Sequence, residues 1–229
     1  MKRIFSLSFV LMANLTIMQP ALAQDMQSDH TTSEHLVDLS RSHWCYDCTV
    51  DVLDKYQVMQ GFSDHTFRGD RPITRYELAS ALLKTQKKLF RTQGISLAFP
   101  EGSHPQVLLR DNHWARKDVT ELISYRGLLG DWAKDFEGDK LATREDLAYA
   151  LSELLRAYRE QKGTLAPPAE RISALGIDIA PHSSHYEAIQ QMLNQQLMSL
   201  YPDHTFRSDQ VVTRYALAAS LCKLFEQVR

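Results

Sequence analysis

Apolar positions recur at helical spacing in the segment that follows Trp44. They are separated by 3, 4, 4 and 3 residues, which places their side chains on one face of a helix. Gly61 follows the last of them and is a helix stop signal. The pattern predicts an amphipathic helix that ends at Gly61. Its apolar members are Cys45, Cys48, Val52, Tyr56 and Met59.

A second helical pattern begins at Thr74. Thr74 and Glu77 form the Thr-x-x-Glu sequence of a capping box, in which each side chain accepts the backbone N–H of the other residue. Leu78, Leu82, Thr85 and Leu89 continue this helix on a face that is apolar except for Thr85. Between the two helices, turn residues at 63–66 and the aromatic Phe67 predict a loop with one buried ring.

The sequence pattern of this helix–loop–helix unit occurs three times. FSDHTFRGDRPITRYELASALLK at 62–84 returns as YPDHTFRSDQVVTRYALAASLCK at 201–223, 139 residues later and without a gap. Thr143 and Arg144 stand halfway between them, so that Arg75, Arg144 and Arg214 are 69 and 70 residues apart. Self-similarity at a fixed period indicates a repeat architecture.

We therefore predict an all-α protein of three units, at residues 36–90, 107–160 and 177–229. The second and third units should form helices at 114–130, 143–158, 186–198 and 213–228. Segments 91–106 and 161–176 contain Gly and Pro and are expected to be linkers. One helix pair cannot bury its own apolar faces, whereas three pairs packed around a shared axis can.

The first 23 residues have the pattern of a secretory signal peptide. Lys2 and Arg3 precede an apolar run at 4–18, and Ala21-Leu22-Ala23 supplies the small-residue cleavage site. The run is too short and too polar for a membrane span, which needs about 20 residues. We expect an exported protein with a loose polar tail at 24–35 and no transmembrane segment in the mature chain.

Composition narrows the class of protein. The chain has 229 residues, 44% of them hydrophobic and 24% charged, and a net charge of −2, and the signal peptide carries two of its positive charges. The absence of a broad basic surface argues against a nucleic-acid partner. The sequence has no nucleophile–base set, phosphate loop or carboxylate pair, and its nine histidines show no metal-ligand spacing. It predicts no enzyme, no metal and no cofactor.

The Cys45-Tyr46-Asp47-Cys48 motif allows three interpretations: half a zinc site, a redox pair or a local disulfide. Zinc would need a second cysteine pair, and only Cys222 remains. A thioredoxin-like role would need a strand before the helix, which a helical repeat lacks. In an oxidising compartment, a Cys45–Cys48 disulfide is the simplest expectation. Cys222 lies on an apolar helix face and is expected to be a buried free thiol.

The repeated pattern resembles the S-layer homology (SLH) domain. FSDHTFRGDRPITRYE and YPDHTFRSDQVVTRYA carry the resemblance most specifically, and the middle copy keeps HWARKDVTELISYRGLLG and ATRED. The resemblance covers nearly all of the mature chain. It implies a spindle-like body, in which a central three-helix bundle carries three prongs with grooves between neighbouring units. It also implies non-covalent attachment to cell-wall glycans, often acidic polysaccharides, at the cell wall, the cell surface or in the periplasm.

The resemblance also implies a set of glycan-binding residues. An arginine at a helix N-terminus combines a fork of donors with a partial positive charge, which suits a sugar carboxylate. Tryptophans could stack on sugar faces, although such rings are also common in protein cores. The arginines could equally be solvated neighbours of the helix caps. The predicted glycan-binding residues are Arg75, Arg144, Arg214, Arg68, Arg207, Thr74, Trp44 and Trp114.

The copies depart from the pattern in ways that bear on binding. Glu137 stands in the middle copy where the others have Arg68 and Arg207, and Tyr76 and Tyr215 stand where the family usually has a small residue. We therefore expect that only some of the three grooves bind. The predicted function is a non-enzymatic envelope protein that binds peptidoglycan-linked or secondary cell-wall polysaccharide. The alternative is a scaffold with an SLH fold that docks a secreted or outer-membrane partner protein.

Overall fold

A computed structural model of the chain describes residues 33–92, 94, 109–110, 112–124, 136–164, 177–180, 183 and 185–228. The predicted signal peptide and most of the polar tail lie outside the described residues. So do nearly all of the two linkers and the centre of the middle loop, at 125–135.

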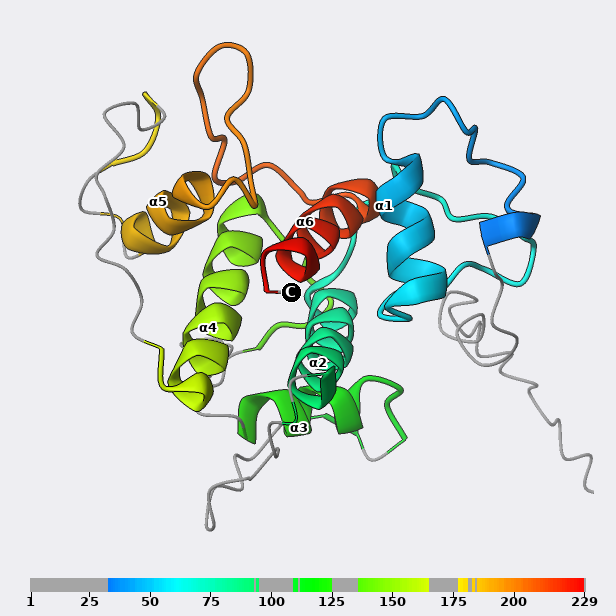
Figure 1. Cartoon of the computed structure of the whole chain (residues 1–229), viewed down its shortest axis with the longest axis horizontal. Coiled ribbons are helices and arrows are strands. Elements are labelled where there is room, and N and C mark those ends of the chain that lie inside the picture. The colour runs from blue at the N-terminus through cyan, green and yellow to red at the C-terminus, as the bar shows by residue number, and fades with distance from the viewer. Residues whose placement is uncertain are drawn as a thin grey trace, which may run out of the picture.

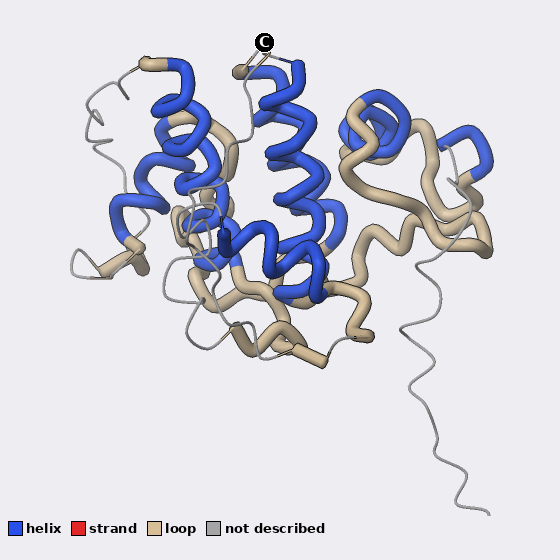
Figure 2. Tube along the Cα trace, turned by 90° about the horizontal axis from the view of Figure 1, so that it is seen from below, coloured by secondary structure: helices blue, strands red, loops and turns tan. Residues whose placement is uncertain are grey.

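The described residues form helices, loops and isolated β-bridges, with no strand among them, which confirms the all-α prediction (Figure 2). Three long helices are α2 (Arg75–Thr92), α4 (Arg144–Lys162) and α6 (Arg214–Gln227). The shorter helices are α1 (Tyr46–Val50), the π-helix η2 (Asp51–Lys55), α3 (Arg116–Ser124) and α5 (Tyr186–Asn194), and a single 3₁₀ turn, η1, covers Ser33–His35.

The long helices begin where the sequence predicts, one residue after the repeated threonine. In α4, Thr143 and Asp146 form a reciprocal capping box. Thr74 and Glu77 do the same in α2, at 3.3 and 2.9 Å. Thr213 caps α6 from one side only, because Ala216 replaces the carboxylate. A threonine cap contributes about 1 kcal/mol to stability.

The first helices of the first and third units are shorter than the sequence predicts. In the first unit helical structure stops at Tyr56, before Gly61, because Gln57 takes a left-handed backbone with φ 57°. Gln196 does the same in the third unit at φ 56°. The chain then folds back, and Val58 and Met59 both donate backbone N–H groups to the carbonyl of Val52. Side chains beyond the helix therefore still reach the core, although the helical period has ended.

The three units meet in a ring of backbone hydrogen bonds. Ile73 N–H donates to Val212, Val212 N–H donates to Ala142, and Ala142 N–H donates back to Ile73, at 3.0, 2.8 and 2.9 Å. All three residues are buried. The middle unit therefore takes an equivalent place in the ring, although its sequence is the most divergent of the three.

Each long helix packs against the first helix of another unit. Figure 1 shows α2, α4 and α6 in the middle of the molecule, with α3 beside α2, α5 beside α4 and α1 beside α6. The first and last units are thus neighbours in space. This arrangement creates three junctions, which we call the 1–2, 2–3 and 3–1 junctions after the units that meet there.

Candidate functional site

The repeated loop before each long helix is held by an aspartate from the start of its own unit. The Asp38 carboxylate accepts the N–H groups of Phe67 and Arg68, both at 2.7 Å. Asp178 does the same for Phe206 and Arg207. Because Phe67 and Phe206 are fully buried, these contacts fix the loop against the core. The same loops carry Arg68 and Arg207.

Arg214 and Arg144 bind the loop of the neighbouring unit. The Arg214 Nε donates to the Phe67 carbonyl at 2.7 Å and its Nη2 to the Gln60 carbonyl at 2.5 Å. Arg144 makes the matching bonds to Phe206 and Ser199, both at 2.7 Å. Burial lowers the pKa of Arg214 to about 10. These two arginines are more than solvated neighbours of a cap, because they join the units.

Arg75 takes the equivalent position in the first unit but has other partners. Its Nε and Nη2 donate to the Asp146 carboxylate, both at 3.2 Å, and its Nη1 lies 3.9 Å from Glu137. Asp146 also completes the cap of α4. At the 1–2 junction two carboxylates are therefore among the partners of the arginine.

The two loop arginines are the accessible cations of the predicted set. Arg68 pairs with Asp64, and Arg207 pairs with Asp203, each at 2.8 Å. These side chains are 36% and 45% exposed. Their guanidinium groups also lie over the rings of Phe62 and Tyr201, at 4.0 and 3.9 Å. Exposed ion pairs of this kind are weak and can exchange partners.

Trp44 stands on the surface of the 3–1 junction. It is 71% exposed, so the alternative that it is a core residue is wrong. Its ring lies 5.6 Å from His43 and 6.1 Å from Tyr215, which belongs to the last unit. His43 and Tyr215 are themselves 4.3 Å apart. We call these three residues the 3–1 aromatic cluster.

The 1–2 junction repeats this arrangement. Trp114 is 37% exposed, and its ring lies 5.9 Å from His113 and 6.1 Å from Tyr76. His113 and Tyr76 are 4.5 Å apart. These residues form the 1–2 aromatic cluster. Two of the three junctions thus present an indole ring supported by a histidine and a tyrosine from different units.

The tyrosine of each cluster depends on a glycine that the sequence analysis did not single out. The Tyr215 N–H donates to the Gly69 carbonyl, and a Cβ added at Gly69 would lie 2.0 Å from the Tyr215 ring. Gly138 and Tyr76 have the same relation, also at 2.0 Å. The signal in the sequence was a glycine two residues after Phe67 and Phe136, in the two loops that face a tyrosine.

The 2–3 junction lacks this cluster. Glu145 takes the place of the tyrosine, and its N–H donates to Ser208 where the other junctions have glycine. Its carboxylate contacts His185 Nδ1 at 2.6 Å. Tyr186, half-buried, stands at the position of the tryptophans. The three junctions therefore differ in chemistry, and the expectation that only some of the grooves bind stays a prediction.

The remaining predicted residues have structural partners. The Thr74 hydroxyl is used by the helix cap. Cys45 and Cys48 are free thiols in place of the expected disulfide, and Cys222 is a buried free thiol as predicted. Within the described part of the chain, no group of three side chains could hold a metal ion, and no helix has the length and apolar character needed to cross a membrane.

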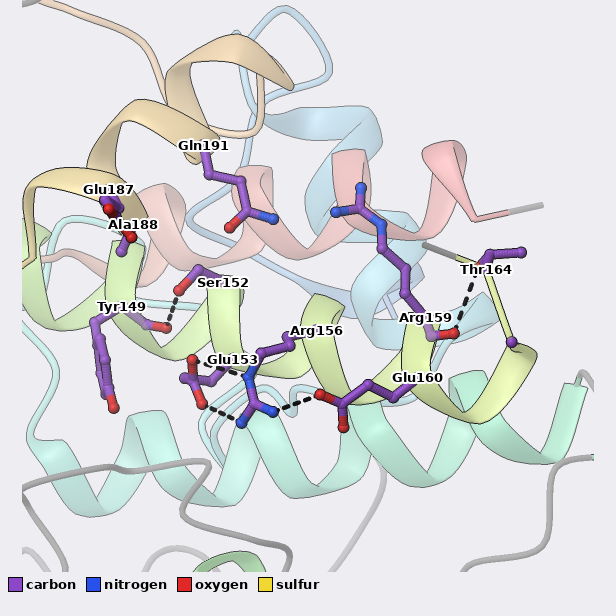
Figure 3. Close-up of a pocket in the computed structure, with 11 residues that line it drawn as sticks. Tyr149, Ser152, Glu153, Arg156, Arg159, Glu160, Thr164, Glu187, Ala188 and Gln191 are labelled. Atoms are coloured by element: carbon purple, nitrogen blue, oxygen red, sulfur yellow. Dashed lines mark hydrogen bonds and ion pairs between the residues drawn. The ribbon is translucent and has the colours of Figure 1, made fainter. Parts of the chain in front are cut away.

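A cavity of about 610 Å³ lies between α4 and α5 (Figure 3). Arg156, on its wall, is bound by Glu153 at 2.6 Å and by Glu160 at 2.7 Å, and these two carboxylates raise its pKa. None of the predicted glycan-binding residues lines this cavity. The candidate site is therefore the pair of aromatic clusters and the neighbouring loop arginines.

Comparison with known proteins supports the same family. The family model of the S-layer homology domain matches residues 37–79 and 178–217, which lie in the first and third units. Outer membrane protein SlpA of Deinococcus radiodurans is 25% identical over 181 residues, covering 72% of this chain and 14% of that protein. Outer membrane protein SlpA of Thermus thermophilus is 31% identical over 114 residues, covering 48% and 12%.

A cellulosome-anchoring protein of Acetivibrio thermocellus is 27% identical over 104 residues, covering 44% of this chain and 22% of that protein. The chain thus spans less than a quarter of each of these relatives. The first and third units are thus similar to the S-layer homology domain. The family model does not match the middle unit. Its structural equivalence to the other two units is inferred from the ring of backbone hydrogen bonds.

Proposed function

We propose that the protein is a non-enzymatic, exported component of the cell envelope that attaches to a cell-wall polysaccharide. The observation that carries the proposal is the pair of exposed tryptophans at equivalent junctions. An apolar ring held at the surface by a second ring suits the flat, C–H-rich face of a sugar. Relatives with outer-membrane and anchoring names agree with an envelope location.

The loop arginines extend this proposal to acidic sugars. In Arg75, Arg144 and Arg214 the Nε and Nη2 groups already donate to protein oxygens, so we place the carboxylate contact at Arg68 and Arg207. Each of these is partly exposed and paired with a single exposed aspartate. A carboxylate on the polymer would compete with that aspartate and form a charge-assisted bidentate contact.

The tryptophan contact is tested by binding to isolated cell-wall sacculi. Aromatic stacking contributes about 0.5–1.5 kcal/mol, so Trp44→Ala and Trp114→Ala should each weaken binding about threefold to tenfold. The melting temperature should stay close to that of the wild type for Trp44→Ala, because the ring is largely exposed. Val37→Ala is the matched control, since Val37 is 75% exposed in the same unit and outside the cluster. Undiminished binding by the double variant would refute the glycan proposal and favour the protein-docking scaffold.

The charge contact is tested separately. Arg68→Ala combined with Arg207→Ala should reduce binding to sacculi and flatten its dependence on salt, because screening acts on exposed charges. Lys55→Ala is the control, since Lys55 forms an exposed ion pair with Asp51 outside the repeated loops. If the double variant keeps both the affinity and the salt dependence, the polymer is recognised as a neutral sugar.

A further inference from the structure

Helix α1 and the π-helix η2 both pack against α6, and Figure 1 shows α1 beside α6. At one end, the Cys45 thiol donates to the Tyr215 carbonyl at 3.5 Å. Just after η2, the Tyr56 ring stacks on the Phe225 ring of α6 at 3.9 Å with an interplanar angle of 8°. Cys48 lies in α1 and Cys222 in α6, and their side chains contact each other where the helices pack. Residues 174 positions apart in the chain thus become neighbours.

The three cysteines at this contact differ in access and in bonding. Cys45 and Cys222 are buried, and Cys48 is half-buried. The Cys45 sulfur is occupied on both sides, because it donates to the Tyr215 carbonyl and accepts the Thr49 hydroxyl at 3.7 Å. Apart from its contact with Cys48, the Cys222 thiol has a long contact of 3.9 Å to the Glu226 carboxylate. Cys222 is therefore freer than Cys45 to react with Cys48.

Cys48 is the least buried of the three and contacts both of the others, which favours it as the reactive thiol. Hydrogen bonds from Cys222 first and Cys45 second stabilise its thiolate and lower the pKa of Cys48 well below the usual range. The same contacts with Cys48, together with burial, raise the pKa of Cys45 and Cys222. A thiolate is the nucleophile in disulfide exchange, so the most accessible of the three sulfurs is also the one that attacks first.

We propose that Cys48 and Cys222 form a disulfide that joins the first unit to the last. The oxidant is a small disulfide such as oxidised glutathione. The Cys48 thiolate attacks one of its sulfurs and releases a thiolate, and the Cys222 sulfur then attacks Cys48. The second small thiolate leaves and takes up the Cys222 proton. Two electrons pass to the small disulfide, which becomes one thiol and one thiolate, and that thiolate takes a proton from water.

The crosslink would close the 3–1 junction, where the two units are not consecutive in the chain. The units that meet at the 1–2 junction are consecutive in the chain, and so are those at the 2–3 junction. The first and last units are not consecutive, and packing and hydrogen bonds hold them together. A disulfide between distant residues restricts the unfolded chain more than a Cys45–Cys48 disulfide would, because those two cysteines are only three positions apart. Oxidation would therefore stabilise the junction that presents Trp44.

The pairing can be read directly by peptide mapping of the full chain after incubation with oxidised glutathione and alkylation. Trypsin should release Ser42–Lys55 joined to Tyr215–Lys223, and glutathione should cleave the pair. In the oxidised wild-type protein, chymotryptic cleavage after Tyr46 places Cys45 and Cys48 on different fragments. The cysteine that is linked to Cys222 can therefore be identified without a substitution. The expected product joins Cys222 to the fragment that contains Cys48.

Variants provide the controls. Cys45→Ser should keep the linked peptide, and Cys222→Ser should lose it. Oxidation should raise the melting temperature of the wild type and of Cys45→Ser, but not that of Cys222→Ser. The proposal is overturned if the oxidised wild type contains an internal Cys45–Cys48 disulfide, a bond between two chains, or three unreacted thiols.

Discussion

Arg214→Ala is expected to lower the free energy of unfolding by about 3 kcal/mol. The substitution leaves the Phe67 and Gln60 carbonyls without their charged donor, and each lost bond of this kind costs about 1.5–3 kcal/mol. It also empties the space beside the Phe62 and Phe67 rings, which lie 4.9 and 4.6 Å from the guanidinium carbon. Denaturant unfolding should report the loss as a lower midpoint.

Two companion variants separate this effect from a general loss of charge. Arg214→Lys should recover only part of the stability, because one ammonium cannot reproduce a planar fork that spans two carbonyls. Arg207→Ala removes an arginine of the same unit whose ion pair is exposed, and it should leave the unfolding midpoint unchanged. Equal destabilisation by Arg214→Ala and Arg207→Ala would show that the bonds between the units contribute little.

Gly69→Ala is expected to destabilise the protein by about 2 kcal/mol, a typical cost of overpacking a buried site. The added methyl group would stand 2.0 Å from a ring atom of Tyr215. That ring is 4% exposed and is held between His43 and Phe67, so it cannot move aside freely. The shift should also disturb the 3–1 aromatic cluster and reduce sacculus binding along with stability.

A double-mutant cycle tests whether position 69 needs a glycine because of the Tyr215 ring. The 2–3 junction already pairs Ser208 with Glu145, so Gly69→Ser combined with Tyr215→Glu copies a natural combination of this protein. We expect the double variant to be more stable than the two single losses would predict, by at least 1 kcal/mol of coupling. Ser208→Ala should be nearly neutral. Strictly additive losses would mean that Gly69 serves the loop backbone rather than the tyrosine.

The sequence by itself determined the repeated units, the start of each long helix and the all-α class. The helix starts and the all-α class follow from local patterns, which are the Thr-x-x-Glu cap and the spacing of apolar residues. The repeated units follow from the return of the same sequence at an offset of 139 residues. The sequence was less reliable at the ends of the first helices. Gln57 and Gln196 take left-handed conformations, which a sequence predicts for glycine and not for glutamine. The apolar spacing also continues into the segment that folds back, so it does not mark the end of the helix.

Only the tertiary structure decided which side chains are free to act. The three repeated arginines have the same motif, and each bonds to a neighbouring unit: Arg144 and Arg214 to loop carbonyls, and Arg75 to the Asp146 carboxylate. These partners lie far from each arginine in the sequence. The exposure of Trp44 and the meeting of Cys48 with Cys222 likewise depend on which helices become neighbours. Such contacts between distant residues leave no local periodicity, so they are set by how the ring of three units closes.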